Sequence, residues 1–408
     1  MMVSELLPVR VERPVRAILD RLASATPVPP FSTQAFDLLA DLSRRILQAP
    51  TTARQPDAVA LGYWLRPAHL RRLIDQRPRP RTDVLRVPAG LAFHIPPANV
   101  DTMFAYSWAV GLLTGNRQVI RLSRRRGELA DRLLPLIGQA LAAAPDLADG
   151  TAFVEYDHDE AITAAISARC DLRVIWGGDG TVAAIRAVPL SPHAKEIVFA
   201  DRRSLAILSA SAVRALGPDA LATLAGRLFN DVLTFDQMGC SSPRQLVWVG
   251  PPDAVEAAEA PLMAAMAAEI ARRNYQIPIA TALEKYAAAC RAALRGAARS
   301  IRMDRTDWML VDLGDDPVAA PAGSHPGGGL LYRSRVEALA QIAPMIDRSV
   351  QTVTHFGIDR TELDALAQLL AGRGIDRMVP VGEALAFEVV WDGYDLFDEF
   401  TRCVVIRA

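Results

Sequence analysis

The feature that most constrains how this chain folds is a repeated alternation of short apolar segments with amphipathic helical segments, starting at Val84. Apolar runs such as QVIRLS, AFVEY and LRVIWGG are each followed by a segment with apolar residues at helical spacing, for example GELADRLLPLIGQALAAA. Strands that alternate with helices in this way form a parallel sheet covered by helices on both faces. We therefore predict an α/β protein, and ligands in such folds bind at the carboxyl ends of the parallel strands.

The N-terminal part of the chain has a helical pattern instead. Thr33–Gln48 carries apolar residues at helical spacing, and Ser32 or Thr33 can cap this helix. A second helical stretch runs from about Ala58 to Leu73, and the segment RPRPRTD (77–83) indicates a linker. Near the other end of the chain, DPVAAPAGSHPGGG (316–329) is rich in proline and glycine and is expected to be a surface loop.

Length and charge limit the classes of protein to consider. A chain of 408 residues is too long for one compact core, so we expect two or three lobes. The formal net charge of −1 gives no electrostatic reason to expect nucleic acid or an anionic membrane as the main partner. The most apolar stretch, 103–115, is shorter than the ~20 residues that a membrane-spanning helix needs.

The cysteines indicate a reducing environment. Cys170, Cys240, Cys290 and Cys403 are scattered, with no CxxC pair and no cysteine–histidine cluster at zinc spacing. The first residues, MMVSELLPVRVERPVR, lack the apolar core of a secretion signal. We therefore expect a cytoplasmic protein without disulfides and without a metal site.

Cys240 differs from the other cysteines because it lies in a turn of small residues, within DQMGCSSPRQLVWVG (236–250), just before an apolar strand. Such a turn leaves room for a substrate, although a thiol needs a lowered pKa or a nearby base to be mostly thiolate. The alternative is a small buried apolar residue, which is what most cysteines are. Local sequence leaves both interpretations of Cys240 open, whereas the apolar contexts of Cys170, Cys290 and Cys403 favour burial.

The segment HIPPANVDT (94–102) joins an apolar strand to a helix. Asn99 in this segment could donate its amide N–H to a developing oxyanion, a contact worth about 3–4 kcal/mol in a transition state. Alternatively, Asn99 or Asp101 caps the helix that follows, which is a very common use of these residues. From local sequence alone, the cap is the favoured interpretation.

A basic segment, NRQVIRLSRRRGE (116–128), follows the next strand. Arg121, Ser123 and Arg124 stand at the carboxyl end of that strand, where the forked donors of arginine suit a phosphate. The alternative is a solvated basic run before a helix.

A glycine-rich turn, in VIWGGDGTVAAIR (174–186), joins a later strand to its helix. Backbone N–H groups near Gly177 and Gly178, at the start of the helix, could face a pyrophosphate. The run is not GxGxxG, so a tight strand–helix connection is the alternative.

The six histidines show no spacing that would make one of them a base for a cysteine nucleophile. His94, His158 and His355 lie near strand ends, and His325 lies in the segment rich in proline and glycine. A cysteine–histidine hydrolase stays open as an alternative.

Taken in order, an asparagine turn, a basic strand end, a glycine turn and a small-residue cysteine turn resemble the aldehyde dehydrogenase superfamily. More narrowly, the chain resembles the LuxC family of fatty acyl-CoA reductases in HIPPANVDTMFAYSWAVGLLTGN, WGGDGTV, DQMGCSSP, QTV (351–353) and WDGYDL (391–396). The resemblance extends from about Val84 to the C-terminus. It implies an aldehyde-dehydrogenase-like α/β fold with a Rossmann-type cofactor domain, an α/β catalytic domain and a helical N-terminal segment.

The resemblance implies roles for two residues in the chemical step. Cys240 matches the acyl-accepting nucleophile of the superfamily. Asn99 matches the asparagine of its oxyanion hole, with the backbone N–H of Cys240 as the second donor.

The resemblance also implies a cofactor site. Arg121 falls where the superfamily has a lysine that contacts the adenosine ribose, and Ser123 and Arg124 follow it. NAD-preferring members have an acid near the position of Arg124, so a cation there favours the 2′-phosphate of NADPH. Gly177 matches the first glycine of the cofactor turn and precedes Gly178, whereas the second glycine of the superfamily pattern is displaced.

One departure from the superfamily concerns water activation. Hydrolytic aldehyde dehydrogenases have a glutamate base, in a Glu-Leu-Gly-Gly context, before the catalytic cysteine. The corresponding stretch here, VFADRRSLAIL (198–208), has no glutamate, and Glu196 is out of register. An enzyme that does not activate water holds a thioester intermediate, which suits the reduction of an acyl thioester.

These observations predict an NADPH-dependent reductase that converts an acyl thioester to an aldehyde through an S-acyl form of Cys240. The expected acyl donor is acyl-CoA or an acyl-carrier or acyl-transfer protein, and a homo-oligomer is expected because superfamily members usually form one. The alternatives are an acyltransferase or thioesterase that uses a histidine such as His355 without nicotinamide, and a non-catalytic scaffold. We expect N-terminal helices and the cofactor domain over 1–230, a catalytic domain over 231–380 and a C-terminal segment, 381–408, that returns to the cofactor domain or an oligomer interface.

Overall fold

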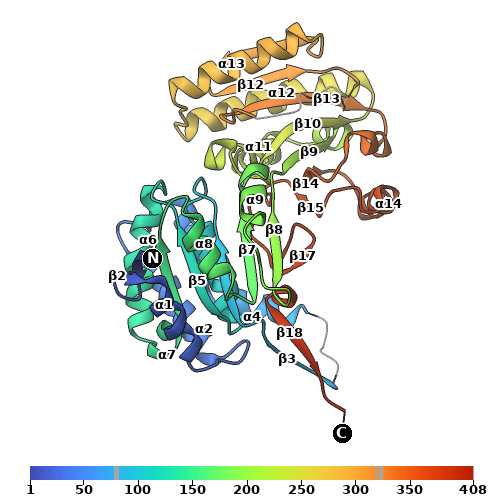
Figure 1. Ribbon diagram of the computed structural model, residues 1–408. Coiled ribbons are helices and arrows are strands. Elements are labelled where there is room, and N and C mark those ends of the chain that lie inside the picture. Colours follow the sequence, from blue (N-terminus) through green and yellow to red (C-terminus); the bar gives the residue numbers. More distant parts are fainter. Residues whose placement is uncertain (78–81, 317, 319, 321–324, 408) are drawn as a thin grey trace. The chain divides into compact units, whose positions relative to one another are not determined.

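The chain forms two compact units. The computed structural model describes residues 1–77, 82–316, 318, 320 and 325–407, so the predicted linker (77–83) and loop (316–329) lie partly outside the described residues. The first unit comprises Met1–Ala200 and Phe387–Ala408, and the second comprises Asp201–Ala386. Figure 1 shows the elements of both units coloured along the chain.

The first unit is built on a seven-stranded sheet in the order β2-β1-β6-β5-β4-β7-β8. The five strands from β4 to β8 are parallel, as the strand–helix alternation predicts. The strand order reverses between β4 and β7, which is where open α/β sheets bind their ligands. The strands are β1 (Met2–Leu7), β2 (Val11–Pro14), β4 (Leu91–Ile95), β5 (Arg117–Leu122), β6 (Thr151–Glu155), β7 (Leu172–Trp176) and β8 (Lys195–Phe199).

The hairpin formed by β1 and β2 adds an antiparallel edge to this sheet, ahead of the predicted N-terminal helices. The sequence pattern does not predict it, because the central residue of β1 is an acid. Glu5 is 1% exposed and forms ion pairs with Arg13 and Arg21. A buried carboxylate paired with two guanidinium groups replaces the apolar residue that a half-buried strand usually carries.

The helices of the first unit cover both faces of its sheet. The predicted helix Thr33–Gln48 is confirmed as α2, and the Oγ of Ser32 accepts from the N–H of Ala35 at 3.3 Å as its cap. The predicted stretch 58–73 is two helices, because Pro67 begins a new first turn. The helices are α1 (Val15–Ser24), α2 (Thr33–Gln48), α3 (Pro56–Trp64), α4 (Pro67–Asp75), α5 (Met103–Leu113), α6 (Glu128–Ala142), α7 (Pro145–Asp149), α8 (Glu160–Ser167), α9 (Asp179–Arg186) and α15 (Leu396–Glu399).

The predicted strand over 84–95 is two strands in different sheets. Gly90, with φ of +135°, breaks it, and a Cβ there would lie 2.0 Å from Oδ2 of Asp171. The first part, β3 (Val84–Pro88), pairs antiparallel with β18 (Thr401–Val405) in a two-stranded ribbon. The C-terminal segment of the chain therefore returns to the first unit.

The WDGYDL motif forms a short hairpin in that C-terminal segment. Asp392 and Gly393 have φ of +50° and +79°, the left-handed pair that a tight two-residue hairpin turn requires. The hairpin joins β16 (Val390–Trp391) to β17 (Tyr394–Asp395). The carboxylate of Asp395 then accepts from the N–H of Asp398 and starts α15.

The second unit has its own seven-stranded sheet, in the order β11-β12-β13-β10-β9-β14-β15, parallel except for the edge strand β11. Its strands are β9 (Arg203–Ser209), β10 (Pro243–Val249), β11 (Ser300–Arg305), β12 (Trp308–Asp312), β13 (Leu330–Val336), β14 (Val350–Phe356) and β15 (Arg377–Pro380). Its helical segments are α10 (Ala210–Arg214), α11 (Pro218–Leu233), η1 (Thr234–Gln237), α12 (Pro252–Arg272), α13 (Ile279–Leu294), η3 (Leu339–Met345) and α14 (Arg360–Leu370).

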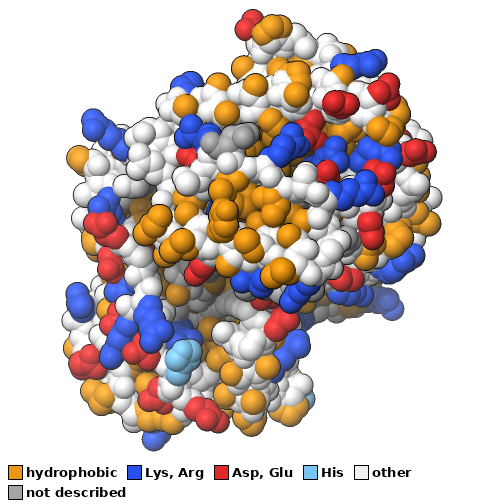
Figure 2. Space-filling view, turned by 90° about the horizontal axis from the view of Figure 1, so that it is seen from above, with side chains coloured by type: hydrophobic (Ala, Val, Ile, Leu, Met, Phe, Trp, Pro, Cys, Tyr) orange, Lys and Arg blue, Asp and Glu red, His pale blue; other side chains and the backbone are white. Residues whose placement is uncertain are grey.

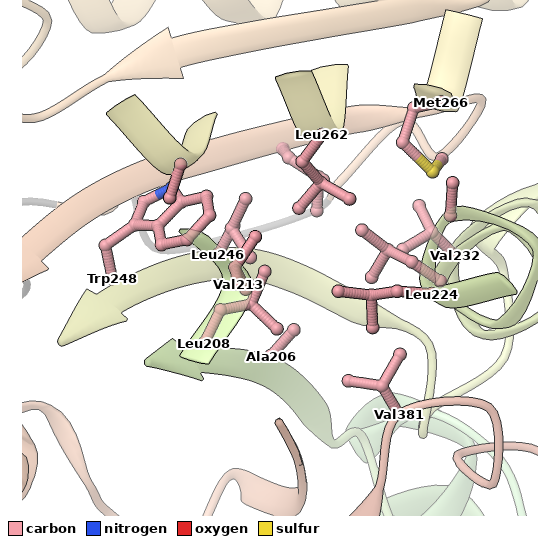
Figure 3. Close-up of a cluster of buried hydrophobic side chains, with 14 of the residues drawn as sticks. Ala206, Leu208, Val213, Leu224, Val232, Leu246, Trp248, Leu262, Met266 and Val381 are labelled. Carbon is pink, nitrogen blue, oxygen red and sulfur yellow. The ribbon is translucent and has the colours of Figure 1, made fainter. Parts of the chain in front are cut away.

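The division between the units falls at 200/201 rather than at 230/231. Residues 201–230 join the second unit because β9 pairs with β10 and β14 in its sheet and α11 packs on α12. Figure 3 shows this core, in which Leu246 of β10 lies below Leu262 of α12, and Met266 of α12 lies near Val232 of α11. Burial of each such side chain contributes about 1.5–3 kcal/mol.

Helix α13 exposes apolar residues along one side. Ile279, Leu283, Tyr286 and Leu294 are 54–88% exposed, and they recur at helical spacing. Figure 2, which views the molecule from above, shows hydrophobic side chains gathered on that face with basic side chains near them. None of the described helices is long and apolar enough to cross a membrane.

Candidate functional site

Cys240 lies in a tight turn between η1 and the amino end of β10. The N–H of Ser242 donates to the carbonyl of Gly239 at 3.0 Å and closes this turn. Cys240 is half-buried, whereas Ser241 and Ser242 are buried. The cysteine therefore stands at the amino edge of the second sheet, and the prediction that ligands meet the carboxyl edge does not extend to this residue.

The residues that lead into Cys240 have an unusual backbone. Phe235, Asp236 and Gln237 have φ of 55°, 51° and 64°, the left-handed region in which an L-residue costs roughly 1–2 kcal/mol. We call residues 234–242 the Cys240 turn. Three consecutive strained residues persist only where the surroundings hold them, and such strain clusters at functional sites.

The buried amide of Gln237 holds the Cys240 turn. Its Nε2 donates to the carbonyls of Pro243 and Leu330, each at 2.8 Å, and its Oε1 accepts from the N–H of Gly329 at 2.9 Å. Gln237 is 1% exposed, so these bonds form away from water. One side chain thus joins the turn to the starts of β10 and β13.

Three glycines pack against the Cys240 turn. Gly327, Gly328 and Gly329, here called the glycine segment, have φ of 72°, 60° and 80°. A Cβ on Gly327 would lie 2.4 Å from the carbonyl oxygen of Asp236, so no larger residue fits. The prediction of a surface loop over 316–329 is wrong for these three residues, because they are buried beneath the turn.

A serine on β9 connects the Cys240 turn to the neighbouring strands. The Oγ of Ser204 donates to the carbonyl of Cys240 at 2.8 Å and accepts from the N–H of Thr352 at 3.2 Å. Thr352 belongs to the QTV motif, which the structure places at the amino end of β14. The motif and the cysteine, distant in sequence, therefore lie at the same edge of the second sheet.

Arg244, at the start of β10, interacts electrostatically with Cys240. Burial lowers the pKa of Arg244, against the charges of Asp201 and Cys240, which raise it. A guanidinium stays protonated in proteins, so this cation favours the thiolate form of a nearby cysteine. The carboxylate of Asp201 is drawn to the same guanidinium.

His355 does not lie within reach of Cys240. It is in register with Ile207 of β9, which in turn is in register with Val247 of β10. Val247 is about 13 Å along the strand from Pro243, at the rise of 3.3 Å per residue for parallel strands. The alternative of a hydrolase that pairs Cys240 with His355 is therefore not supported by the geometry.

Two other histidines are held neutral by burial. His94, at 0% exposure on β4, has its pKa lowered to about 3 by burial. Burial, followed by the charge of Arg244, lowers the pKa of His325 to about 3. The Nδ1 of His325 accepts from the N–H of Gly327 at 3.1 Å, which fixes the ring beside the glycine segment.

The other cysteines differ from one another. Cys170 is buried, and burial raises the pKa of its thiol to about 12. The prediction of burial is wrong for Cys290 and Cys403, which are exposed on α13 and β18. Their neighbours in sequence are apolar, but these faces of the helix and the strand point outward.

Asn99, in the first unit, does not cap the helix that follows it. Asn99 is exposed in the turn between β4 and α5. Asp101 accepts from the N–H groups of Gly127, at 2.9 Å, and Leu129, at 3.1 Å, and so caps α6. The prediction that one of the two caps the following helix is wrong, because the cap position of α5 is Thr102 and makes no side-chain bond.

Arg121, at the end of β5, bonds to the segment that follows β6. Its guanidinium lies 5.0 Å from the ring centre of Tyr156 and donates to the carbonyls of Tyr156 and Asp157, at 3.3 and 3.1 Å. The Oγ of Ser123 accepts from the N–H of Arg125 at 3.1 Å. Both side chains therefore shape the carboxyl edge of β5 and β6.

Arg124 is the more available cation at this edge. Its side chain is 63% exposed and lies 3.8 Å from oxygens of both Glu155 and Asp157. Glu155 forms its closer ion pair with Arg126, which also pairs with Asp131 at 2.6 Å. Glu155 therefore has a closer cationic partner than Arg124.

A pocket of about 480 Å³ opens beside Arg124, within the usual range for small-ligand sites. It lies beside the carboxyl end of β6 and the β1–β2 hairpin, two strands away from β4, where the strand order reverses. One cation, Arg124, lines it together with five carboxylates: Glu12, Glu155, Asp157, Asp159 and Glu160.

The glycine turn after β7 leads into the start of helix α9. The N–H of Gly177 donates to the carbonyl of Phe199 at 3.0 Å, so this group is used within the first unit. Gly178 is the cap residue of α9 and provides no side-chain cap. The first N–H groups of α9 are therefore the ones that suit an anion.

Glu196 does not act as a base in this structure. It accepts from Arg173 and from Arg186, each at 2.8 Å, on the edge strand β8 of the first unit. Glu196 is therefore part of an ion-pair cluster, as its position out of register suggests.

Sequence reasoning missed three residues that build the Cys240 turn, Ser204, Gln237 and Arg244, and a fourth, Lys285, that lies beneath it. Each is a polar residue inside an apolar or small-residue segment, and that contrast is the signal that could have found them. Lys285 was visible as one of only two lysines in the chain.

The two sheets, with a strand-order reversal in one and a cysteine turn in the other, define the aldehyde dehydrogenase fold. Aldehyde dehydrogenase 21 from Physcomitrella patens, in complex with succinate, is 13% identical with a TM-score of 0.67, covering 96% of this chain and 90% of that one. A lactaldehyde dehydrogenase is 14% identical with a TM-score of 0.67, covering 100% and 95%. GapN from Methanocaldococcus jannaschii DSM 2661, complexed with NADP, is 12% identical with a TM-score of 0.63, covering 96% and 93%.

The sequence places the chain more narrowly. Residues 66–403 match the family described as acyl-CoA reductase (LuxC), whereas no curated protein matches the chain. The protein therefore belongs to the LuxC acyl-CoA reductase family, which confirms the resemblance of its motifs and supports an aldehyde-forming reductase.

Proposed function

We propose that the protein reduces an acyl thioester to an aldehyde, with NADPH as reductant, through an S-acyl intermediate on Cys240. The observation that carries this proposal is the Cys240 turn itself. It presents a half-buried thiol beside the cation of Arg244, in a strained and tightly held backbone. Membership of the acyl-CoA reductase family supports the class of reaction.

In the first step, the thiolate of Cys240 attacks the carbonyl carbon of the acyl thioester. The C–S bond to the donor breaks, and the donor leaves as a thiol after it takes up a proton. We propose that the side-chain amide of Asn99 and the N–H of Cys240 donate to the oxyanion, contacts typically worth about 3–4 kcal/mol each in the transition state. The exposed Asn99 is compatible with this role, since capping does not occupy it.

The chain is suited to holding the resulting thioester away from hydrolysis. The stretch 198–208 contains no glutamate, and Glu196 is bound to Arg173 and Arg186. Asp201 interacts with Arg244, which reduces its ability to activate water. The acyl group is therefore expected to persist on Cys240 until it is reduced.

We propose that a dinucleotide binds along the carboxyl edge of the first sheet. The start of α9 presents backbone N–H groups that suit a phosphate, and Arg124 adds a cation beside carboxylates that can accept from ribose hydroxyls. Arg121 and Ser123 shape the same edge, and Gly177 and Gly178 form the turn before α9. The chemistry that a bound nicotinamide supplies is the hydride that reduces the thioester.

The preference for NADPH rests on Arg124. Its contacts with Glu155 and Asp157 are long, so its guanidinium can turn to a 2′-phosphate. Glu155 keeps its closer ion pair with Arg126 when Arg124 turns. The assay compares kcat/KM for NADPH and NADH, and a preference for NADH would contradict this part of the proposal.

The central test is the mass of the acyl-enzyme. Incubation with acyl-CoA and no nicotinamide should add one acyl group to Cys240, and NADPH should then remove it as aldehyde. The Cys290→Ala variant, which lacks an exposed thiol outside the turn, should be acylated like the wild type. If Cys240→Ala retains reductase activity or acylation, the proposal is wrong.

The donor and the assembly are proposals as well. The acyl donor is acyl-CoA or an acyl-carrier or acyl-transfer protein, which rates measured with each donor distinguish. We propose a homo-oligomer in which the β3–β18 ribbon meets a second copy. Leu85 and Val404, cross-strand partners in this ribbon, are 53% and 42% exposed, and a two-stranded ribbon is marginally stable alone. Light scattering should show that Leu85→Asp with Val404→Asp dissociates it, and a monomeric wild type would contradict the proposal.

A further inference from the structure

The chain contains two lysines, and one of them is fully buried. Lys285 on α13 is 0% exposed, whereas Lys195 on β8 is partly exposed and lies 3.5 Å from Glu399. Burial of an ammonium group is costly unless it is paired and hydrogen-bonded. The position of Lys285 therefore calls for a physical reason, in a protein that otherwise uses arginine.

The partners of Lys285 are two backbone carbonyls. Its Nζ donates to the carbonyl of Gly328 at 2.5 Å and to that of Thr306 at 2.9 Å. Burial lowers the pKa of Lys285 to about 8, against the charge of Asp307, which raises it. Hydrogen bonds from an ammonium are about twice as strong as those between neutral groups.

Gly328 links Lys285 directly to the Cys240 turn through two hydrogen bonds. Its carbonyl accepts from Lys285, and its N–H donates to the carbonyl of Asp236 at 2.8 Å. Asp236 is the middle residue of the left-handed run that precedes Cys240. A single peptide segment therefore separates the ammonium from the strained part of the turn.

The hydrogen bonds of Lys285 hold together two backbone segments that form no regular hydrogen-bonded ladder. The run 235–237 and the glycine segment are both left-handed, and they cross at Asp236 and Gly327 with no room for a Cβ. A Cβ on Gly328 would lie 3.3 Å from Cδ of Lys285, so the lysine stem packs against the same segment. Lys285 thus supplies both apolar contact and a charge-assisted bond at the crossing.

We propose that Lys285 is a positioning residue, which fixes the Cys240 turn in its reactive conformation by tethering the glycine segment. This inference rests on the proposed role of Cys240 as the nucleophile. Lys285 does not itself contact the acyl group, because its Nζ is buried and donates to Gly328 and Thr306.

The test compares Lys285→Met with the wild type in the reactivity of Cys240. Methionine keeps the unbranched apolar stem and removes the ammonium. We expect the rate of alkylation of Cys240 by iodoacetamide, and kcat for aldehyde formation, to fall roughly tenfold to a hundredfold, as for a misplaced reacting group. KM for the nicotinamide should change less than twofold, because its site is in the first unit. Lys195→Met, the matched control, should behave as the wild type in each measurement.

A second variant is used in case Lys285→Met does not fold. Lys285→Gln keeps N–H donors in the buried site and is therefore less disruptive than methionine, but it lacks the charge that strengthens the bonds to Gly328 and Thr306. We expect the alkylation rate of Cys240 in Lys285→Gln to fall about threefold to tenfold below that of the wild type.

The outcomes separate this inference from the proposed function. If Lys285→Met loses only thermal stability, while alkylation and kcat stay within twofold of the wild type, Lys285 is merely structural and the inference is overturned. An unchanged alkylation rate in Lys285→Gln overturns it too. If wild-type Cys240 is acylated neither by acyl-CoA nor by an acyl-carrier or acyl-transfer protein, the proposed function fails, yet iodoacetamide still reports whether Lys285 sets the turn.

Discussion

Replacement of Gln237 by leucine should uncouple the Cys240 turn from the second sheet. The change removes two donors, to the carbonyls of Pro243 and Leu330, and one acceptor, for the N–H of Gly329. Each buried polar group left without a partner costs about 1–3 kcal/mol, so the three groups together cost about 3–9 kcal/mol. Burial of the leucine side chain recovers roughly 1–2 kcal/mol. We expect a net loss of about 1–8 kcal/mol, a large part of the total stability of a typical domain.

The assay for this variant combines urea unfolding with hydrogen exchange. Tryptophan fluorescence follows the unfolding of both units, since Trp248 and Trp308 lie in the core of the second unit and the other four tryptophans lie in the first. Exchange should accelerate in peptides that cover 234–250 and 327–336, where the lost bonds lie. Gln34→Leu, a change at an exposed residue of α2, should stay within about 0.5 kcal/mol of the wild type. A Gln237→Leu variant that unfolds within 0.5 kcal/mol of the wild type, with unchanged exchange, would refute the reasoning.

Other changes should act at single sites. Arg124→Ala should raise KM for NADPH about tenfold and leave KM for NADH nearly unchanged in steady-state assays, since only the 2′-phosphate loses a partner. Asp101→Ala should cost the first unit about 1–2 kcal/mol in urea unfolding, because α6 loses its cap; an unchanged midpoint would contradict this. Burial raises the pKa of Asp231 to about 7, so stability should fall by up to roughly 4 kcal/mol as pH rises from about 4 to about 7, and level off above. Asp231→Asn should lack this fall in urea titrations at several pH values.

Strand–helix alternation predicted most of the first sheet and much of the second. The pattern works there because buried parallel strands are continuously apolar and their helices keep one apolar face. It failed at β1, where a buried ion-paired Glu5 takes the place of an apolar residue. The sequence pattern also predicted β3 and β4 as one strand, because the periodicity of apolar residues does not show the change of chain direction at Gly90.

The sequence predicted which segments form the candidate site, but it did not predict how these segments are arranged in space. The sequence singled out Cys240, and it singled out Asn99 through the resemblance. It could not show that three left-handed residues precede the cysteine, because Phe235 and Gln237 carry no sign of that conformation. Nor could it show that GGG lies beneath the turn, since glycine-rich segments are usually surface loops. The capping prediction for Asp101 failed because the helix that it caps, α6, is not the next one along the chain.

The return of the C-terminal segment to the first unit has a consequence for synthesis on the ribosome. Phe400, 1% exposed, accepts through its carbonyl from the N–H of Ala89 at 3.1 Å and from Nδ2 of Asn116 at 2.8 Å. Strand β18 then completes the ribbon with β3. At roughly 5–20 residues per second, translation of residues 201–386 separates these partners by about 10–40 s. The unit that begins first is thus finished last, and β3 must wait unpaired while the whole second unit emerges and folds.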